Sequence, residues 1–226
     1  MKKRYEEEGV SYANIAKEFK ASTETIKRVI SENNFKRTFN NLRKVNKYLK
    51  EDYFSVIDTP EKAYWLGFLF TDGSVDNLKQ KRIRLQLQAA DEEILIKYKE
   101  DLGVSGKIIR DERPNSICLS VEFNSAQMFD DLEKYGIIPR KTYETDHLPL
   151  SLIPEEYQTS FLLGMFDGDG CITHGKNCSE VTIGLTSYHE SIVTEFRDAI
   201  DKLIDKTDHN KVFFTSAWHI NWRGRQ

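Results

Sequence analysis

Two aspartates occupy equivalent positions in two related segments of this 226-residue chain. The segments are AYWLGFLFTDGSV at 63–75 and FLLGMFDGDGCI at 161–172, in which Gly67, Asp72 and Gly73 align with Gly164, Asp169 and Gly170, each 97 positions apart. Each apolar stretch predicts a helix that ends at its Asp-Gly pair. Two neighbouring carboxylates repel each other, and a divalent cation with oxygen ligands relieves the repulsion. The pair therefore predicts a magnesium-type site, with two simple Asp-Gly turns as the alternative interpretation.

The glycines of the two segments predict close packing. Gly67 and Gly164 lie inside apolar helices, where glycine costs about 1 kcal/mol relative to alanine. Because glycine has no side chain, two such helices can bring their backbones together, and we expect them to pack against each other. Gly73 and Gly170 follow the last helical turn, where we expect the left-handed conformation. Both carboxylates would then lie at the negative ends of helix dipoles, which adds to the need for a cation.

The resemblance between the two halves continues after these segments. IRLQLQAADEEIL (83–95) aligns with VTIGLTSYHESIV (181–193), and ICLSVEF (117–123) aligns with WHINW (218–222). Each unit reads as helix, strand, strand, helix, strand, strand, and the first adds a helix at about 125–135. In this alignment Leu85 and Leu87 of the first unit match Ile183 and Leu185 of the second, all expected on the buried side. The pattern predicts an α+β fold with antiparallel sheets.

The alternating strands predict a polar sheet face in each unit. Arginine, glutamine and asparagine recognise guanine and adenine edges, and a two-stranded ribbon fits the major groove of DNA. We therefore expect the polar residues of both sheets to contact DNA. In the first unit these residues are Arg82, Arg84, Gln86, Gln88, Arg110 and Arg113, and in the second they are Thr182, Thr186, Lys211, His219, Asn221 and Arg223.

The motifs resemble those of the LAGLIDADG homing endonucleases, specifically the single-chain type with two motifs. The two copies are WLGFLFTDG (65–73) and LLGMFDGDG (162–170); the first departs from the family wording at Phe70, where an acidic residue is common. The phrases GIIPRKT (136–142) and LSLIPEEYQTSFLLG (150–164) also resemble family members. The resemblance covers about residues 54–226. It implies two pseudo-symmetric αββαββ(α) repeats with saddle-shaped antiparallel sheets, joined by two packed motif helices.

The resemblance also implies an activity, which is site-specific hydrolysis of double-stranded DNA with Mg²⁺ or another divalent cation such as Mn²⁺. Asp72 and Asp169 would hold the metal and act in catalysis. Lys141 stands where the family has a lysine beside the site, and it would stabilise transition-state charge; a surface lysine in a linker is the alternative. Asp167 adds a carboxylate as a salt-bridge or supporting group. The expected partner is a long asymmetric DNA target bound by a monomer.

The N-terminal segment SYANIAKEFKASTETIKRVISENN predicts a helix-turn-helix. Ile15, Ala16 and Phe19 give the first helix an apolar face, as Ile26, Val29 and Ile30 do for the second, and Ser22 or Thr23 can cap the second helix. Thr25, Lys27 and Arg28 would then face DNA. A helical hairpin that packs on another part of the protein is the alternative.

The formal net charge of −3 argues weakly against nucleic-acid binding, but the charge is unevenly distributed, and the basic first fifty residues are typical of a nucleic-acid-binding segment. Residues 1–50 contain 13 Lys+Arg against 6 Asp+Glu, whereas residues 51–226 contain 20 against 30. We divide the chain into a helix-turn-helix (1–36), a basic linker (37–53), a first repeat (54–142), an inter-repeat linker (143–154) and a second repeat (155–226). The second repeat ends before any counterpart of 125–141, so we expect it to be truncated, which puts its activity in question.

Three cysteines without metal-type spacing, no secretory signal and no membrane-length apolar run predict a cytoplasmic protein of a bacterial, phage or organellar genetic element. Two other functions remain open. One is a non-cleaving DNA-binding regulator on the same scaffold, and the other is an RNA maturase that binds intron RNA. An intein is disfavoured because no splicing-domain sequence flanks the repeats.

Overall fold

The computed structural model divides the chain into two compact units, residues 1–47 and residues 48–226. It describes residues 2–6, 12–35, 48–76, 80–114, 116–174, 180–205 and 210–225, without the side chains of 6, 174, 180 and 223–225. Most of the expected linker 37–53 lies outside the described residues. No helix in these ranges has the length and apolar character needed to cross a membrane.

The N-terminal unit is a small helical cluster of α1 (Lys2–Glu6), α2 (Tyr12–Glu18) and α3 (Thr23–Glu32). Its buried residues are Tyr5, Ile15, Ala16, Ile26 and Ile30. The cap of α3 is Ser22, whose Oγ accepts a hydrogen bond of 3.1 Å from the backbone N–H of Thr25. The prediction that Phe19 belongs to the apolar face was wrong, because it lies past the end of α2 and is 46% exposed.

The first repeat of the larger unit contains two layers of structure. Its elements are α4 (Pro60–Thr71), β1 (Gly73–Asp76), β2 (Arg82–Gln88), α5 (Glu92–Leu102), β3 (Ile109–Arg113), β4 (Ser116–Asn124) and α6 (Ala126–Lys134). The strands form an antiparallel sheet in the order β1-β2-β4-β3. The predicted sequence of elements, including the closing helix, is confirmed.

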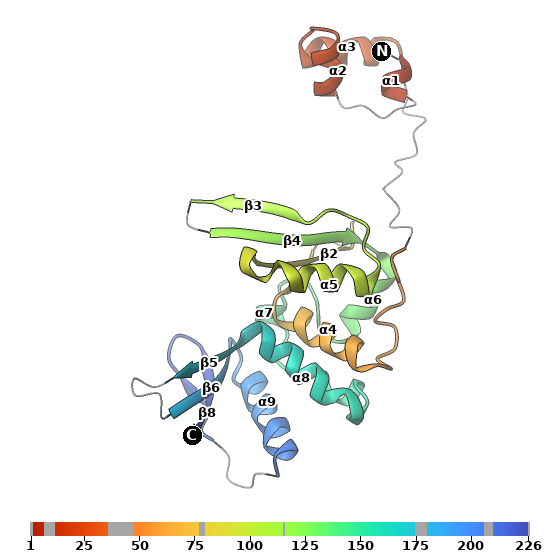
Figure 1. Ribbon diagram of the computed structural model, residues 1–226. Coiled ribbons are helices and arrows are strands. Elements are labelled where there is room, and N and C mark those ends of the chain that lie inside the picture. Colours follow the sequence, from red (N-terminus) through yellow and green to blue (C-terminus); the bar gives the residue numbers. More distant parts are fainter. Residues whose placement is uncertain are drawn as a thin grey trace. The chain divides into compact units, whose positions relative to one another are not determined.

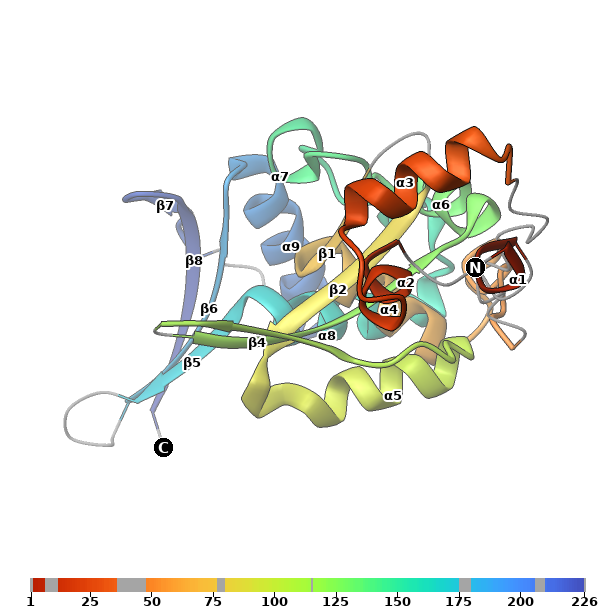
Figure 2. The ribbon, with the colours of Figure 1, turned by 90° about the horizontal axis from the view of Figure 1, so that it is seen from above.

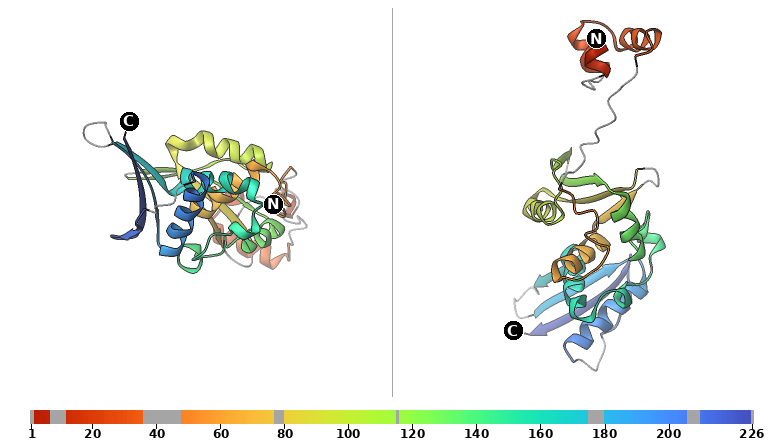
Figure 3. Two further views of the ribbon diagram at one scale, coloured as in Figure 1. Left: turned by 90° about the horizontal axis from the view of Figure 1, so that it is seen from below. Right: turned by 90° about the vertical axis from the view of Figure 1, so that its right-hand side faces the viewer.

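The second repeat has the same order of elements and the same sheet topology. After the short helix α7 (Lys141–Glu144) come α8 (Glu155–Asp169), β5 (Gly170–His174), β6 (Glu180–Ser187), α9 (Glu190–Leu203), β7 (Phe213–Phe214) and β8 (Trp218–Arg225). The sheet order is β5-β6-β8-β7. Figures 1 and 3 show α4 and α8 side by side between the two sheets. The predicted α+β fold of two repeats joined by packed motif helices is confirmed.

The strand register corrects the alignment of the two repeats. Gly73 pairs with Leu85, and the equivalent Gly170 pairs with Leu185, so Leu85 corresponds to Leu185 rather than to Ile183. Leu185 is buried, whereas Ile183 lies on the same sheet face but is 39% exposed, so the prediction that Ile183 is buried was wrong. The error has a simple cause: a shift of two residues keeps every side chain on its own sheet face, so alternation alone cannot detect it.

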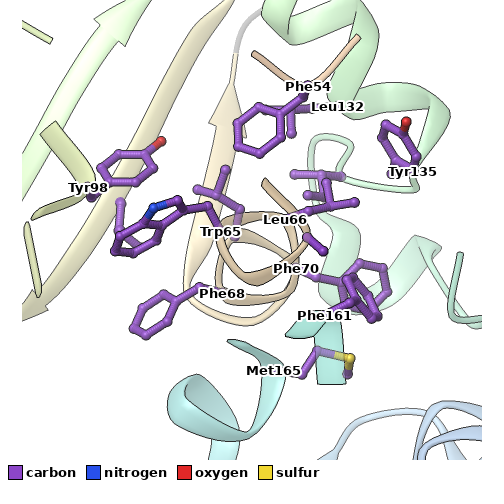
Figure 4. Close-up of a cluster of buried hydrophobic side chains, with 14 of the residues drawn as sticks. Phe54, Trp65, Leu66, Phe68, Phe70, Tyr98, Leu132, Tyr135, Phe161 and Met165 are labelled. Atoms are coloured by element: carbon purple, nitrogen blue, oxygen red, sulfur yellow. The ribbon is translucent and has the colours of Figure 1, made fainter. Parts of the chain in front are cut away.

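The motif helix α4 is buried on almost all sides. Residues 65–70 are buried without exception, as expected for a helix that packs against neighbours all around its axis. Trp65 packs on Tyr98 of α5, with ring centroids 5.2 Å apart, and Phe70 packs on Phe161 of α8 at 5.9 Å. Figure 4 shows these side chains pointing to different sides of α4. The core therefore holds the helix ends in fixed places.

Candidate metal and DNA site

The two motif helices cross at their glycines with reciprocal contacts. A β-carbon added to Gly67 would lie 2.0 Å from the carbonyl oxygen of Phe161, and one added to Gly164 would lie 2.0 Å from that of Tyr64. Tyr64 and Phe161 are themselves equivalent positions of the two repeats, 97 residues apart. No side chain larger than hydrogen fits at these distances, so the close approach predicted at Gly67 and Gly164 is present.

Gly73 and Gly170, which follow the motif helices, are needed for a different reason from the one predicted. Among described glycines only Gly103 and Gly136 have positive φ, and Gly170 is extended with φ −80° and ψ 159°. The prediction of left-handed caps was wrong, because Gly73 and Gly170 begin strands directly. A β-carbon at Gly73 would lie 2.5 Å from the Leu69 carbonyl oxygen, and one at Gly170 would lie 2.3 Å from that of Phe166. The chain passes directly from helix to strand at these two positions, and any side chain there would overlap the last turn of the helix, so both positions require glycine.

Asp72 and Asp169 occupy the ends of α4 and α8. Asp72 is the residue after α4 and Asp169 is the last residue of α8. A β-carbon on Gly168 would lie 2.6 Å from the Asp72 carboxylate, which places that carboxylate against the residue before Asp169. The same β-carbon would lie 2.0 Å from the Thr71 hydroxyl oxygen, so a side chain at 168 would displace the Thr71 and Asp72 side chains; the sequence interpretation gave this glycine no role.

The carboxylates occupy an electrostatically unfavourable position. Burial and the charge of Asp169 raise the pKa of Asp72 to about 6, with Asp91 adding to the rise and Lys141 opposing it. Partial burial of the Asp169 carboxylate raises its pKa as well, and the charge of Lys141 opposes that rise; the rest of the side chain is exposed to solvent. A cation near both groups would favour their ionised forms.

Lys141 lies beside this pair. Its ammonium group donates a hydrogen bond of 2.6 Å to the carbonyl oxygen of Thr71, at the end of α4. Burial lowers the pKa of Lys141, while the charges of Asp169 and Asp72 act in the opposite direction. The surface-linker alternative does not describe this lysine, because it is half-buried at the ends of both motif helices.

The polar faces of both sheets adjoin the carboxylates. Gln86 and Gln88 of β2 and Ser74 of β1 line one cavity with Asp72, and Thr186 of β6 lines another with Asp169. In the second sheet Asn221 pairs with Gly184 and His219 with Thr186, so Thr182, Thr186, His219 and Asn221 share a face. Lys211 is exposed, and the side chain of Arg223 lies outside the described part.

The arginines of the first sheet are all paired with acids in this structure. Arg84 lies 3.0 Å from Glu122, Arg82 contacts Asp76 and Glu122, and Arg113 lies 2.9 Å from Asp111. Arg110 does not share their face. It pairs across the strands with Leu119, whereas Arg113 pairs with Ser116, so the prediction of a common face was wrong for Arg110. Residues three apart in a regular strand point to opposite sides.

Two exposed apolar residues on the polar faces were missed. Ile109 of β3 pairs with Ser120, and Phe213 of β7 pairs with His219, at corresponding places in the two sheets. They are 47% and 40% exposed. Apolar side chains on a groove-reading surface can contact thymine methyl groups. Their equivalence was hidden because the strands β3 and β7 have unrelated sequences.

The donor set fits a magnesium ion, although it contains few protein ligands. Among described residues no group of three or more His, Cys, Asp or Glu side chains is placed to hold a metal. Mg²⁺ typically keeps several waters and takes only one or two protein carboxylates together with substrate phosphates. The two carboxylates, whose raised pKa values reflect a crowded and partly buried position, match that requirement.

Comparison with known proteins agrees with this fold. Residues 156–221 match the family described as LAGLIDADG-like domain. The homing endonuclease I-WcaI bound to its DNA recognition sequence is 14% identical with a TM-score of 0.52, over 80% of this chain and 85% of that one. I-LtrWI bound to target DNA (12%, TM-score 0.44, 77% and 80%) and the N-terminal LAGLIDADG domain of WhiA (14%, 0.45, 80% and 84%) are also similar. No curated protein sequence matches the chain. The larger unit thus has the LAGLIDADG homing endonuclease fold.

Proposed function

We propose that this chain, whose larger unit has the fold of the LAGLIDADG homing endonucleases, is a site-specific endonuclease that hydrolyses double-stranded DNA with divalent metal ions. The observation that carries the proposal is the carboxylate pair at the ends of two helices packed at glycine, with a lysine beside it. This arrangement stabilises neither helix, since helix C-terminal ends favour cations over anions. A site that binds a metal and a phosphate accounts for it.

Each group of the site has a separate task in this proposal. Asp72 and Asp169 would hold Mg²⁺ or Mn²⁺, which when bound supplies positive charge to the attacking and leaving oxygens. Lys141 would place its ammonium group against the phosphate and stabilise the charge that develops there. Its anchor on the Thr71 carbonyl fixes the ammonium group before DNA arrives. Such preorganisation avoids a reorganisation cost during the reaction.

The polar faces of the two sheets would read the target. The side chains proposed for contact in the first repeat are Arg82, Arg84, Gln86, Gln88 and Arg113, and in the second they are Thr182, Thr186, Lys211, His219, Asn221 and Arg223. The arginines would exchange their present carboxylate partners for base edges or phosphates. Because the two sheets differ in these side chains, the target would be asymmetric, and a monomer would suffice to bind it.

The N-terminal unit would add a second DNA contact through α3. Its apolar residues are buried within the unit, while Lys27 and Arg28 have side-chain exposures of 56% and 70%. Replacing both with alanine should reduce the slope of log affinity against log salt by about 2, since each lost phosphate contact changes it by about 0.9. An unchanged slope would favour the alternative of a packing hairpin.

A cleavage selection on a random DNA library tests the proposed activity. The full chain is incubated with the library in Mg²⁺ or Mn²⁺, and broken molecules are sequenced. We expect breaks at one long consensus site, which disappear in EDTA and with the double variant Asp72→Asn/Asp169→Asn. Tight binding to a consensus without metal-dependent breaks would favour the regulator, and preferential binding of structured intron RNA would favour the maturase.

A further inference from the structure

Lys141 lies on a short segment that cannot hold its own conformation. The helix α7 that begins with it has only four residues. A single helical turn is unstable in isolation, because it fixes the backbone of several residues for one hydrogen bond. The Lys141 ammonium group nevertheless has a defined place, since it donates to the Thr71 carbonyl oxygen and lines the cavity that contains Asp169. Contacts of the segment 141–148 with the rest of the protein must therefore hold it.

Helix α9 of the second repeat and the residue before it supply such contacts. The His189 ring, directly before α9, lies 3.2 Å from the carbonyl oxygen of Tyr143. The Ser191 hydroxyl donates a hydrogen bond to the carbonyl oxygen of Asp146. Figure 2 shows α7 beside α9. The segment that carries Lys141 is thus held against a helix that comes about fifty residues later in the chain.

Glu195 of α9 makes the strongest of these contacts. One of its carboxylate oxygens accepts a hydrogen bond of 2.7 Å from the backbone N–H of Leu148, and the other contacts the His147 ring. The contact with His147 contributes little, because that side chain is 68% exposed. Leu148 is buried, so without Glu195 its N–H group would be left without a partner in a buried position, which is strongly unfavourable.

The fold itself does not require a carboxylate at this position. Tyr98 of α5 and Phe196 of α9 are equivalent core residues, 98 positions apart, and both are buried. The position before them is Lys97 in the first repeat and Glu195 in the second. Lys97 is exposed, and a lysine side chain cannot accept a hydrogen bond from an N–H group. The carboxylate of Glu195 therefore serves the segment 141–148 and not the core of its own repeat.

We propose that Glu195 is a positioning residue, which acts on DNA cleavage through Lys141 by fixing the segment 141–148 on α9. The inference rests on the proposed nuclease function. An ammonium group stabilises the charge that develops on a phosphate only where it is held in place, and a displacement of about 1 Å can cost about a hundredfold in rate. The hydrogen bonds of Glu195 go to residues 147 and 148, so its effect on the reaction should disappear when the Lys141 ammonium group is removed.

A double-mutant cycle tests the inference. The full chain and its variants cut the selected site in Mg²⁺, and single-turnover rates are measured at saturating protein. Glu195→Ala should slow cleavage about tenfold or more, and Lys141→Met should slow it by about 10²–10³. In the Lys141→Met background, Glu195→Ala should slow cleavage less than about twofold further. A residue with a merely structural role would slow cleavage by the same factor in both backgrounds.

Two further variants isolate the hydrogen bond. Glu195→Gln keeps an oxygen acceptor at the same reach for the Leu148 N–H group, and should cut within about threefold of wild type. Glu155→Ala is the matched control, because Glu155 pairs with Lys202 at the other end of α9, and it should cut like wild type. Fluorescence anisotropy without metal should give DNA affinities within about threefold of wild type for all variants, which separates the loss of rate from loss of folding or binding.

Amide hydrogen exchange gives a readout that does not depend on cleavage. The backbone amides of 141–148 should exchange faster in Glu195→Ala than in wild type or Glu155→Ala. Unchanged exchange, equal slowing in both backgrounds, or a Glu195→Gln variant as slow as Glu195→Ala would overturn the inference and leave the nuclease proposal standing. Absence of any metal-dependent break by the wild-type chain would contradict both.

Discussion

The two repeats share one topology but differ in how much of their structure is covered. In the first, the sheet face that carries Val75 and Ile83 is buried, with α6 completing the core. In the second, the corresponding Ile172 and Ile183 are 59% and 39% exposed. The same sheet order thus yields a well-buried half and a more open half. Repetition of a fold conserves strand order and helix packing, whereas burial and charge can diverge between copies.

The largest effect is expected at the crossing of α4 and α8, a feature to which both repeats contribute equally. Gly164→Ala should destabilise the larger unit by about 3 kcal/mol or more, because its β-carbon would overlap the backbone of Tyr64. Gly67→Ala should cost a similar amount, since the contact is reciprocal. Urea unfolding measures both. Gly106→Ala is the matched control, because the nearest atom to its β-carbon is 3.9 Å away; equal costs at 106 and 164 would contradict the close crossing.

A second comparison uses one substitution in both repeats. Ile83→Ala should cost about 2–3 kcal/mol because Ile83 is fully buried. Ile183→Ala should cost less than about 1 kcal/mol because Ile183 is largely solvated and leaves no cavity. Both free energies of unfolding come from the same urea titration. Similar costs at the two positions would mean that the second sheet face is covered in solution.

The raised pKa of Asp72 predicts that the free energy of unfolding depends on pH, an effect smaller than those of the glycine and isoleucine substitutions. The pKa of Asp72 is raised from 3.8 to about 6 in the folded chain, so the folded state binds more protons between these pH values. Stability should therefore be highest below pH 3.8, as far as this group contributes, and fall as pH rises to 6.

The variant Asp72→Asn cannot ionise and should remove that fall. In EDTA at pH 7 it should be about 1–2 kcal/mol more stable than wild type, as measured by urea unfolding across pH 4 to 7. Asp169→Asn should also be more stable than wild type under these conditions, because burial raises the pKa of Asp169, although Lys141 opposes the rise. A less stable Asp72→Asn at pH 7 would show that the carboxylate is not under repulsive strain.

The sequence was sufficient for the architecture. Two apolar windows with glycine in register predicted α4 and α8 and their contact, and strand alternation predicted both sheets. Register was not predictable to better than two residues, which is why Ile183 was equated with Leu85. Arg110 was assigned to the wrong face because the start of β3 was not known. The sequence pattern of a strand shows which residues share a sheet face, whereas their partners on the next strand are known only from the strand pairing.

The candidate site was less predictable than the fold. Asp72 and Asp169 could be identified because their Asp-Gly pairs lie at equivalent positions of the internal repeat. A single Asp-Gly pair would have indicated only a turn. The position of Lys141 in the cavity of the other repeat could not be inferred, because it depends on contacts of 141–148 with α9 that no local pattern encodes. Ile109 and Phe213 gave no signal, since their equivalence exists only in the strand pairing.

The most direct test of the central claim is the rate of metal-dependent DNA cleavage by three matched variants. Asp72→Asn and Asp169→Asn should each reduce cleavage of the selected site by about 10²–10³, with DNA binding retained. Asp58→Asn, which changes an exposed aspartate just before the other end of α4, should cut like wild type. Undiminished cleavage by Asp72→Asn and Asp169→Asn would contradict the assignment of the paired helix ends as the metal site.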